Sequence, residues 1–277
     1  MTRAITPPGA PRERRDAVHE AAERLATAAR TGVPCAPVRD LIGADDVDFA
    51  YAVQQRFAER RRAAGARLVG RKIGLTSPAV QRQLGVDRPD FGVLFDDMDV
   101  SGLAEVPSAR LLQPKTEAEI AFVLAADLDE GPLDDRQVRD AVAYAVAALE
   151  IVDSRIAGWD ITFGDTVADN ASSGLFVLGD VRRTLAEVEP VEVAMTLRLG
   201  GEVVSEGTGA ACLGDPLLAL AWLARTARDL GEPLRAGQIV LSGALGPMVA
   251  TPPGSAVSAD LGPLGTIGAT FSREGTA

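Results

Sequence analysis

The chain has 277 residues, of which 47% are apolar and 24% charged, and its formal net charge at pH 7 is −11. These proportions are typical of a globular protein with a sizeable core. The acidic balance, without a basic stripe or tail, argues against a nucleic-acid partner.

The longest apolar stretches, 141–149 and 217–224, are too short to cross a bilayer, and the N-terminus has no run like a signal peptide. Two cysteines, Cys35 and Cys212, stand far apart without metal-like spacing. This pattern predicts no disulfide framework. We therefore expect a cytoplasmic protein without a membrane partner.

Residues 1–66 are predicted to form a helical N-terminal region. After a lead-in over residues 1–10, apolar residues recur at helical spacing over 11–30 and again over 45–64. Each run is followed by a glycine, which favours the end of a helix.

From residue 67 to residue 277, short apolar runs are separated by Gly, Pro and Asp, which predicts a β-rich body. We expect strands over 68–73, 117–125, 151–154 and 175–178, a hairpin of 191–199 and 202–205, and several short strands within 237–272. We expect helices over 76–84, 134–149 and 215–230, the first and last capped by Thr76 and Asp215. The helical N-terminal region and the β-rich body together predict the α+β class. No linker separates the two regions, so the chain is expected to be one cooperative unit.

Histidine and lysine are scarce. The one histidine, His19, stands in a charged segment and is expected on the surface of a helix. Acid–base or metal chemistry must then rely on carboxylates, lysine or water. Of the 28 Lys and Arg residues only Lys72 and Lys115 are lysines. Buried lysine can release its proton whereas arginine cannot, so both lysines are candidates for proton transfer.

Glu117 and Glu119 open an otherwise apolar strand. Strand alternation puts them on one face, which continues as Ala121 and Val123. Two buried carboxylates side by side repel each other and lose their hydration, and a divalent cation between them removes both penalties. Ligation by oxygen alone suits Mg²⁺ or Mn²⁺. The alternative is that both glutamates lie in water at the mouth of the strand.

Glu150 is isolated among apolar residues, at the predicted junction between a helix and a strand. A negative charge at the C-terminus of a helix is unfavourable for the helix dipole, so a compensating group is expected. A metal ion is one candidate. The alternative is a residue that only marks the end of the helix.

Lys72 lies between Gly70 and Gly74, which predicts a lysine that points inward near a turn. The hydroxyl and backbone N–H groups of Thr76 and Ser77 at the following helix start favour an anion such as a carboxylate. Asp90, in Pro-Asp-Phe-Gly, is typical of a turn. The segment 169–173 is also interpreted as a turn, with polar groups that an active site can use.

Together these segments resemble the 2-keto-4-pentenoate (2-hydroxypenta-2,4-dienoate) hydratases of the fumarylacetoacetate hydrolase superfamily. The resemblance extends over nearly the whole chain. The motifs that carry it are Gly70–Ser77, Leu84–Gly92, Glu117–Ala121, Leu149–Ile156, Asp165–Ser172 and Ser242–Met248.

The resemblance implies a mixed β-roll or barrel core of the fumarylacetoacetase C-terminal type with a helical N-terminal part. It implies that Glu117, Glu119 and Glu150 bind Mg²⁺ or Mn²⁺. It also implies a large homo-oligomer, such as a pentamer or decamer, and association with a pathway aldolase or decarboxylase.

The resemblance further implies that Lys72 is an acid/base residue and that Asp90 and Ser172 lie near the substrate. The family also carries arginine at the position of Lys115, which implies that Lys115 supplies charge only. The implied reaction adds water to 2-hydroxypenta-2,4-dienoate (2-oxopent-4-enoate), a small 2-oxo or 2-enol carboxylate. Its product is 4-hydroxy-2-oxopentanoate, in the catabolism of aromatic compounds by meta-cleavage.

Three alternatives remain open. A 4-oxalocrotonate decarboxylase of the same family carries the same glutamates and lysine, although Arg71, Asp90–Gly92 and Gly243–Pro247 favour the hydratase. A carbon–carbon bond hydrolase of the superfamily commonly uses a His–Glu pair, which a chain with only His19 disfavours. A non-catalytic partner subunit has no need for three carboxylates and a lysine at these positions.

Overall fold

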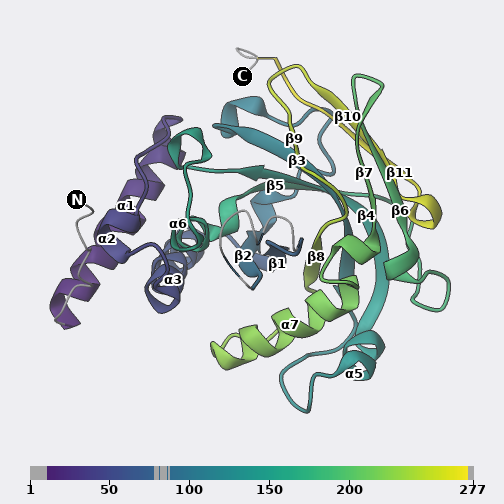
Figure 1. The fold of residues 1–277 in the computed structure, drawn as a ribbon, viewed down its shortest axis with the longest axis horizontal. Coiled ribbons are helices and arrows are strands. Elements are labelled where there is room, and N and C mark those ends of the chain that lie inside the picture. Colours follow the sequence, from purple (N-terminus) through teal and green to yellow (C-terminus); the bar gives the residue numbers. More distant parts are fainter. Residues whose placement is uncertain (1–10, 78–80, 82–85, 87, 274–277) are drawn as a thin grey trace.

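The computed structural model describes residues 11–77, 81, 86 and 88–273. The framework of the described chain is a curled, seven-stranded half-barrel sheet in the order β2-β1-β8-β3-β4-β5, with β9 beside β3 (Figure 1). Its strands are β1 (Leu68–Gly74), β2 (Asp90–Phe95), β3 (Pro114–Leu124), β4 (Val142–Asp153), β5 (Ser173–Leu178), β8 (Ile239–Ala244) and β9 (Val249–Ala250). Strands β1 and β8 are parallel, and the other neighbours are antiparallel.

A second, four-stranded sheet has the order β11-β10-β6-β7. Its strands are β6 (Ala194–Leu199), β7 (Glu202–Thr208), β10 (Ala256–Asp260) and β11 (Thr266–Thr270). The predicted hairpin across Gly200 and Gly201 is confirmed as β6 and β7. Both glycines have positive φ, 59° and 95°, which a tight primed turn requires.

Helix α7 (Pro216–Asp229) packs against β8 and against the short helix α5 (Asp135–Asp140). The side chain of Asp215 accepts a hydrogen bond from Leu217 N at 2.8 Å, so the predicted cap is confirmed.

Four helices form one flank of the molecule, opposite the small sheet (Figure 1). They are α1 (Pro11–Thr31), α2 (Arg39–Ile42), α3 (Val47–Ala63) and α6 (Phe163–Ala168). The helices predicted over 11–30 and 45–64 are thus confirmed. The N-terminal helices share an apolar cluster with Ile156, Phe163 and Val167 of the body. This shared core supports a single unit, although the boundary at residue 66 stays a prediction.

The helix predicted over 134–149 is wrong. The helix ends at Asp140, and β4 begins at Val142 and continues to Asp153. Since the run is apolar throughout, its periodicity cannot separate a buried helix from a buried strand, and pairing with β3 and β5 decides for the strand. Glu150 therefore lies within a strand, and the argument from the helix dipole does not apply to it.

Two predicted segments lie outside the described residues: the lead-in over 1–10 and most of the helix over 76–84. The α+β class, with a curled β core and a helical N-terminal part, is confirmed. Among the described helices, none is long and apolar enough to cross a membrane.

Asp165 joins the helical flank to the body through a buried carboxylate. One oxygen accepts hydrogen bonds from Val38 N and Arg39 N, both at 2.9 Å. The other accepts from Thr162 N at 2.9 Å and pairs with the Arg39 guanidinium at 2.8 Å. This carboxylate therefore caps α6 and fixes the start of α2 at once.

Asp165→Asn should lower the free energy of unfolding by about 2–4 kcal/mol, because a buried charge partner of Arg39 and its acceptor capacity are lost. Urea denaturation measures this. The matched control is Asp160→Asn, which removes the exposed partner of the same guanidinium and should have a much smaller effect. Equal losses in the two variants would contradict the role of Asp165.

Candidate active site

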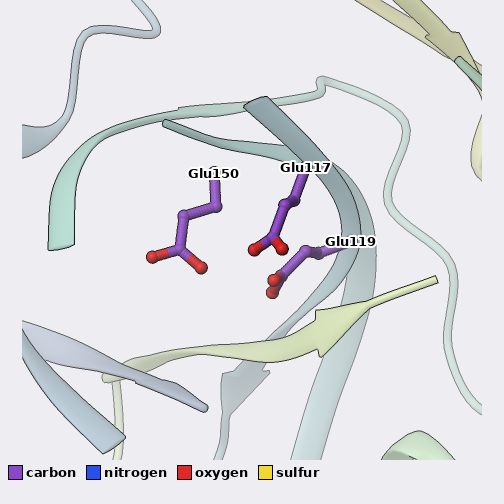
Figure 2. Close-up of side chains that lie close together, drawn as sticks. All are labelled: Glu117, Glu119 and Glu150. Carbon is purple, nitrogen blue, oxygen red and sulfur yellow. The ribbon is translucent and has the colours of Figure 1, made fainter. Parts of the chain in front are cut away.

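Three glutamates converge on one face of the large sheet. Glu117 and Glu119 point to the same side of β3, and Glu117 lies directly opposite Glu150 of β4. Each of the three offers a carboxylate oxygen within 4.8 Å of the others, as Figure 2 shows. Glu119 and Glu150 are buried, while Glu117 is partly exposed. The predicted shared face of Glu117 and Glu119 is thus present, and β4 adds the third carboxylate.

The three carboxylates are electrostatically strained. Burial, reinforced by the charge of Glu150, raises the pKa of Glu117 to about 7 and that of Glu119 well above its usual value. Burial also raises the pKa of Glu150, against the effect of Lys72. Among the described residues, Glu119 Oε1 and both oxygens of Glu150 have no aligned hydrogen-bond donor. Buried acceptors without donors are unfavourable, and a divalent cation that prefers oxygen ligands fits this set.

Lys72 lies beside this cluster, on β1 between β2 and β8, and only 3% of its surface is exposed. Its Nζ is 3.1 Å from Glu150 Oε1 and donates a hydrogen bond to the carbonyl of Ala171 at 3.0 Å. Burial alone lowers the pKa of Lys72, but the charges of the surrounding carboxylates, Glu150 and Asp90 foremost, together outweigh burial and raise it. The predicted inward lysine is therefore buried beside carboxylates that favour its charged form.

Asp90 is the first residue of β2, opposite Gly74 of β1, so its interpretation as a turn residue is wrong. One carboxylate oxygen accepts a weak hydrogen bond from Thr166 Oγ1 at 3.3 Å. Burial raises the pKa of Asp90 to about 6. A Cβ at Gly74 would lie 2.2 Å from Asp90 Oδ1 and 3.4 Å from Lys72 Nζ, so the missing side chain at residue 74 leaves room for the carboxylate near the lysine.

Ser172 is buried in a short 3-10 helix, Asn170–Ser172, and residues 169–173 form the predicted irregular turn. The Ser172 hydroxyl donates to Asp169 Oδ2 at 3.4 Å. The group of this turn that contacts Lys72 is the neighbouring Ala171 carbonyl. A direct role of the hydroxyl toward a substrate stays a prediction.

Gly243 contributes a contact that the sequence did not reveal. Gly243 N donates to Glu119 Oε2 at 2.9 Å. Its φ is +108°, and a Cβ there would lie 2.4 Å from Thr76 Oγ1. Only glycine allows this donor to approach Glu119. A glycine within an apolar strand is a signal for such a close approach.

Of the remaining polar candidates, Lys115 lies two residues before Glu117 on β3 and lowers the pKa of that carboxyl by its charge. His19 is exposed on α1, as expected. Lys115 Nζ lies 4.2 Å from the centre of the Trp159 ring, in a cation–π contact. Arg71 points to the opposite face of β1 from Lys72 and pairs with Glu232 at 3.2 Å. Arg71, which favours the hydratase over the decarboxylase, therefore does so without contacting Glu117, Glu119 or Glu150.

Comparison with known proteins agrees with this geometry. Residues 89–272 match the family model of the fumarylacetoacetate (FAA) hydrolase C-terminal domain. The chain is 53% identical over 252 residues to a 2-keto-4-pentenoate hydratase from Paraburkholderia xenovorans (strain LB400), covering 91% of this chain and 94% of that one. It is 54% identical to a 2-keto-4-pentenoate hydratase from Burkholderia vietnamiensis (strain G4 / LMG 22486), with 91% and 96% coverage.

A solved structure shares the fold at moderate identity. The 4-oxalocrotonate decarboxylase from Pseudomonas putida G7, complexed with magnesium and adipate, has a TM-score of 0.88 at 32% identity and covers 98% of this chain and 100% of its own. The chain therefore belongs to the 2-keto-4-pentenoate hydratase family, within the fumarylacetoacetate hydrolase superfamily.

Proposed function

We propose that this protein is a divalent-metal-dependent hydratase that converts 2-hydroxypenta-2,4-dienoate and water into 4-hydroxy-2-oxopentanoate. The observation that carries the proposal is a buried lysine in contact with one of three convergent carboxylates, in a chain more than 50% identical to proteins named as hydratases for this substrate class. The chemistry needs a proton-transfer group and a means to stabilise a developing negative charge, and these residues can supply both.

Glu117, Glu119 and Glu150 would hold the cation, Mg²⁺ or Mn²⁺. Glu119 Oε1 and both oxygens of Glu150 have no aligned hydrogen-bond donor and are free to do so. The decarboxylase relative, solved with magnesium, supports an ion of this type. When bound, such an ion supplies positive charge that stabilises negative charge on the 2-oxygen of the substrate.

Lys72, assisted by Asp90, transfers a proton between the 2-enol and the terminal carbon of the diene, which gives an α,β-unsaturated ketone. Water then adds at C4, and the overall change is the gain of one water molecule. Burial keeps the Lys72 ammonium out of bulk solvent and so keeps its proton for the substrate. Ser172, in the adjacent turn, is proposed to contact the substrate.

The decarboxylase alternative shares the three glutamates and the lysine. Identity favours the hydratase, because the relatives named as hydratases are 53% and 54% identical and the decarboxylase 32%. The hydrolase alternative lacks its base, since His19, the one histidine of the chain, is exposed on α1. A large homo-oligomer and association with a pathway aldolase or decarboxylase complete the proposal and rest on the family resemblance. A cytoplasmic location, also proposed, rests on the cysteine usage of the chain.

Purified protein with Mg²⁺ or Mn²⁺ should remove the conjugated ultraviolet absorbance of freshly generated 2-hydroxypenta-2,4-dienoate without releasing CO₂. Chelation of the metal should abolish the reaction. Release of CO₂ from 4-oxalocrotonate at a comparable rate would instead identify a decarboxylase, and inactivity with both compounds would refute the proposal.

Lys72→Ala should lower kcat by about 10²–10⁴-fold, the usual contribution of a proton-transfer group. Metal affinity should not weaken, because the substitution removes a positive charge from beside Glu150. Steady-state kinetics and metal titration measure the two effects. Lys115→Ala, at the other lysine of the chain, is the control and should lose far less. Near-normal turnover of Lys72→Ala would exclude the assigned role.

Glu119→Gln should weaken Mn²⁺ binding by more than about tenfold, the lower limit typical of residues that merely orient ligands. The amide keeps the shape of the side chain but removes its charge. Calorimetric titration checks this, with Glu202→Gln on the exposed side of β7 as control. An unchanged affinity in Glu119→Gln would remove this residue from the proposed ligand set.

A further inference from the structure

The turn 169–173 joins the two edge strands of the curled sheet. It leads directly into β5, and at its other side it docks on β2. The Asn170 side chain makes this contact: its Oδ1 accepts from Val93 N at 2.8 Å and its Nδ2 donates to Val93 O at 2.9 Å. The amide thus occupies the place of a neighbouring strand on β2. A Cβ at Gly92 would lie 2.4 Å from Asn170 O, so glycine is needed for this approach.

Arg155 fixes the same turn from its other side. Its Nε pairs with Asp169 Oδ1 at 2.6 Å, and the exposed fractions of the two side chains are 11% and 1%. Its two terminal nitrogens donate to the backbone carbonyls of Asp169 and Ser173, one at each end of the turn. Nη1 also reaches the Asp153 carbonyl at 2.5 Å. A planar guanidinium can satisfy such a divergent set of acceptors, whereas an ammonium cannot.

The contacts of Asn170 and Arg155 maintain an unusual backbone conformation in the turn 169–173. Asn170, Ala171 and Ser172 have φ values of 57°, 51° and 51°, a left-handed conformation that alanine and serine rarely adopt. Such a conformation persists only where the surroundings over-determine it. Its result is that the Ala171 carbonyl points at Lys72 Nζ.

We propose that Arg155 and Asn170 are positioning residues, which fix the turn 169–173 so that the Ala171 carbonyl holds the Lys72 ammonium in place for proton transfer. In the contacts of the described chain, neither side chain touches Lys72 or the three glutamates, so both act through the backbone of the turn. The catalytic consequence rests on the proposed function, whereas the placement of Lys72 does not.

Kinetics of Arg155→Lys test the consequence. The variant keeps the charge but loses the planar array of donors, so kcat should fall by about 10–100-fold while the Kd for Mn²⁺ stays within about threefold, as for a misplaced catalytic group. The matched control is Arg139→Lys, which also alters an arginine that binds a carboxylate and a carbonyl, those of Glu189 and Leu185. It should keep kcat.

Rescue of Arg155→Ala by free guanidinium distinguishes a positioning role of Arg155 from a general loss of stability. Guanidinium chloride at millimolar concentration should restore part of the kcat of Arg155→Ala, whereas sodium chloride at the same concentration should not. A folded Arg155→Lys with wild-type kcat, or an Arg155→Ala without response to guanidinium, would overturn the proposal.

A spectroscopic measurement is independent of the substrate. Because the chain has two lysines, protein labelled with ¹³Cε-lysine gives two signals, which Lys115→Arg assigns. In Arg155→Gln and in Asn170→Asp, which add no lysine, the Lys72 signal should move while the Lys115 signal stays. An unmoved Lys72 signal, or equal movement of both, would refute the positioning role. A moved Lys72 signal in a protein that does not hydrate the dienoate would uphold that role and refute only the proposed function.

Discussion

The burial of three carboxylates within reach of one ammonium group is the constraint on which the rest of the structure depends. Each carboxylate loses hydration on burial, and Lys72 offsets only part of their mutual repulsion. The raised pKa values of the three glutamates and the carboxylate oxygens without aligned donors both result from this excess of buried negative charge. The arrangement is unfavourable for the isolated chain but would suit a cation ligated by oxygen. Such a cation would compensate the buried negative charge inside a protein that is itself acidic.

The curled sheet places these groups by strand order rather than by proximity in the chain. Register between β3 and β4 sets Glu117 opposite Glu150, and β8 lies between β1 and β3. Absent side chains are as important as those present. Gly74 makes room for the Asp90 carboxylate, and Gly243 brings a backbone N–H to Glu119. Both glycines belong to the motifs by which the family is recognised, and the structure gives each a steric reason.

Alternation along a single strand was enough to predict that Glu117 and Glu119 share a face, and flanking glycines were enough to predict an inward Lys72. The strand around Glu150 could not be predicted, because an apolar run without polar positions fits a buried helix equally well. The roles of Arg155 and Asn170 were also hidden. Their partners on β2 and at the ends of the turn are set by tertiary packing. The sequence of a turn does not indicate that one of its backbone carbonyls, here that of Ala171, will contact a lysine.

The parallel pairing of β1 with β8 joins segments separated by more than half of the chain. During synthesis, a nascent chain that already contains Lys72 and all three glutamates still lacks the strand that lies between β1 and β3. The three glutamates lie on the paired strands β3 and β4, whereas the position of Lys72 beside them depends on β8. The late closure of such a long loop also makes rapid folding unfavourable. The contact between Lys72 and Glu150 is thus completed only after β8 has been synthesised and has paired with β1.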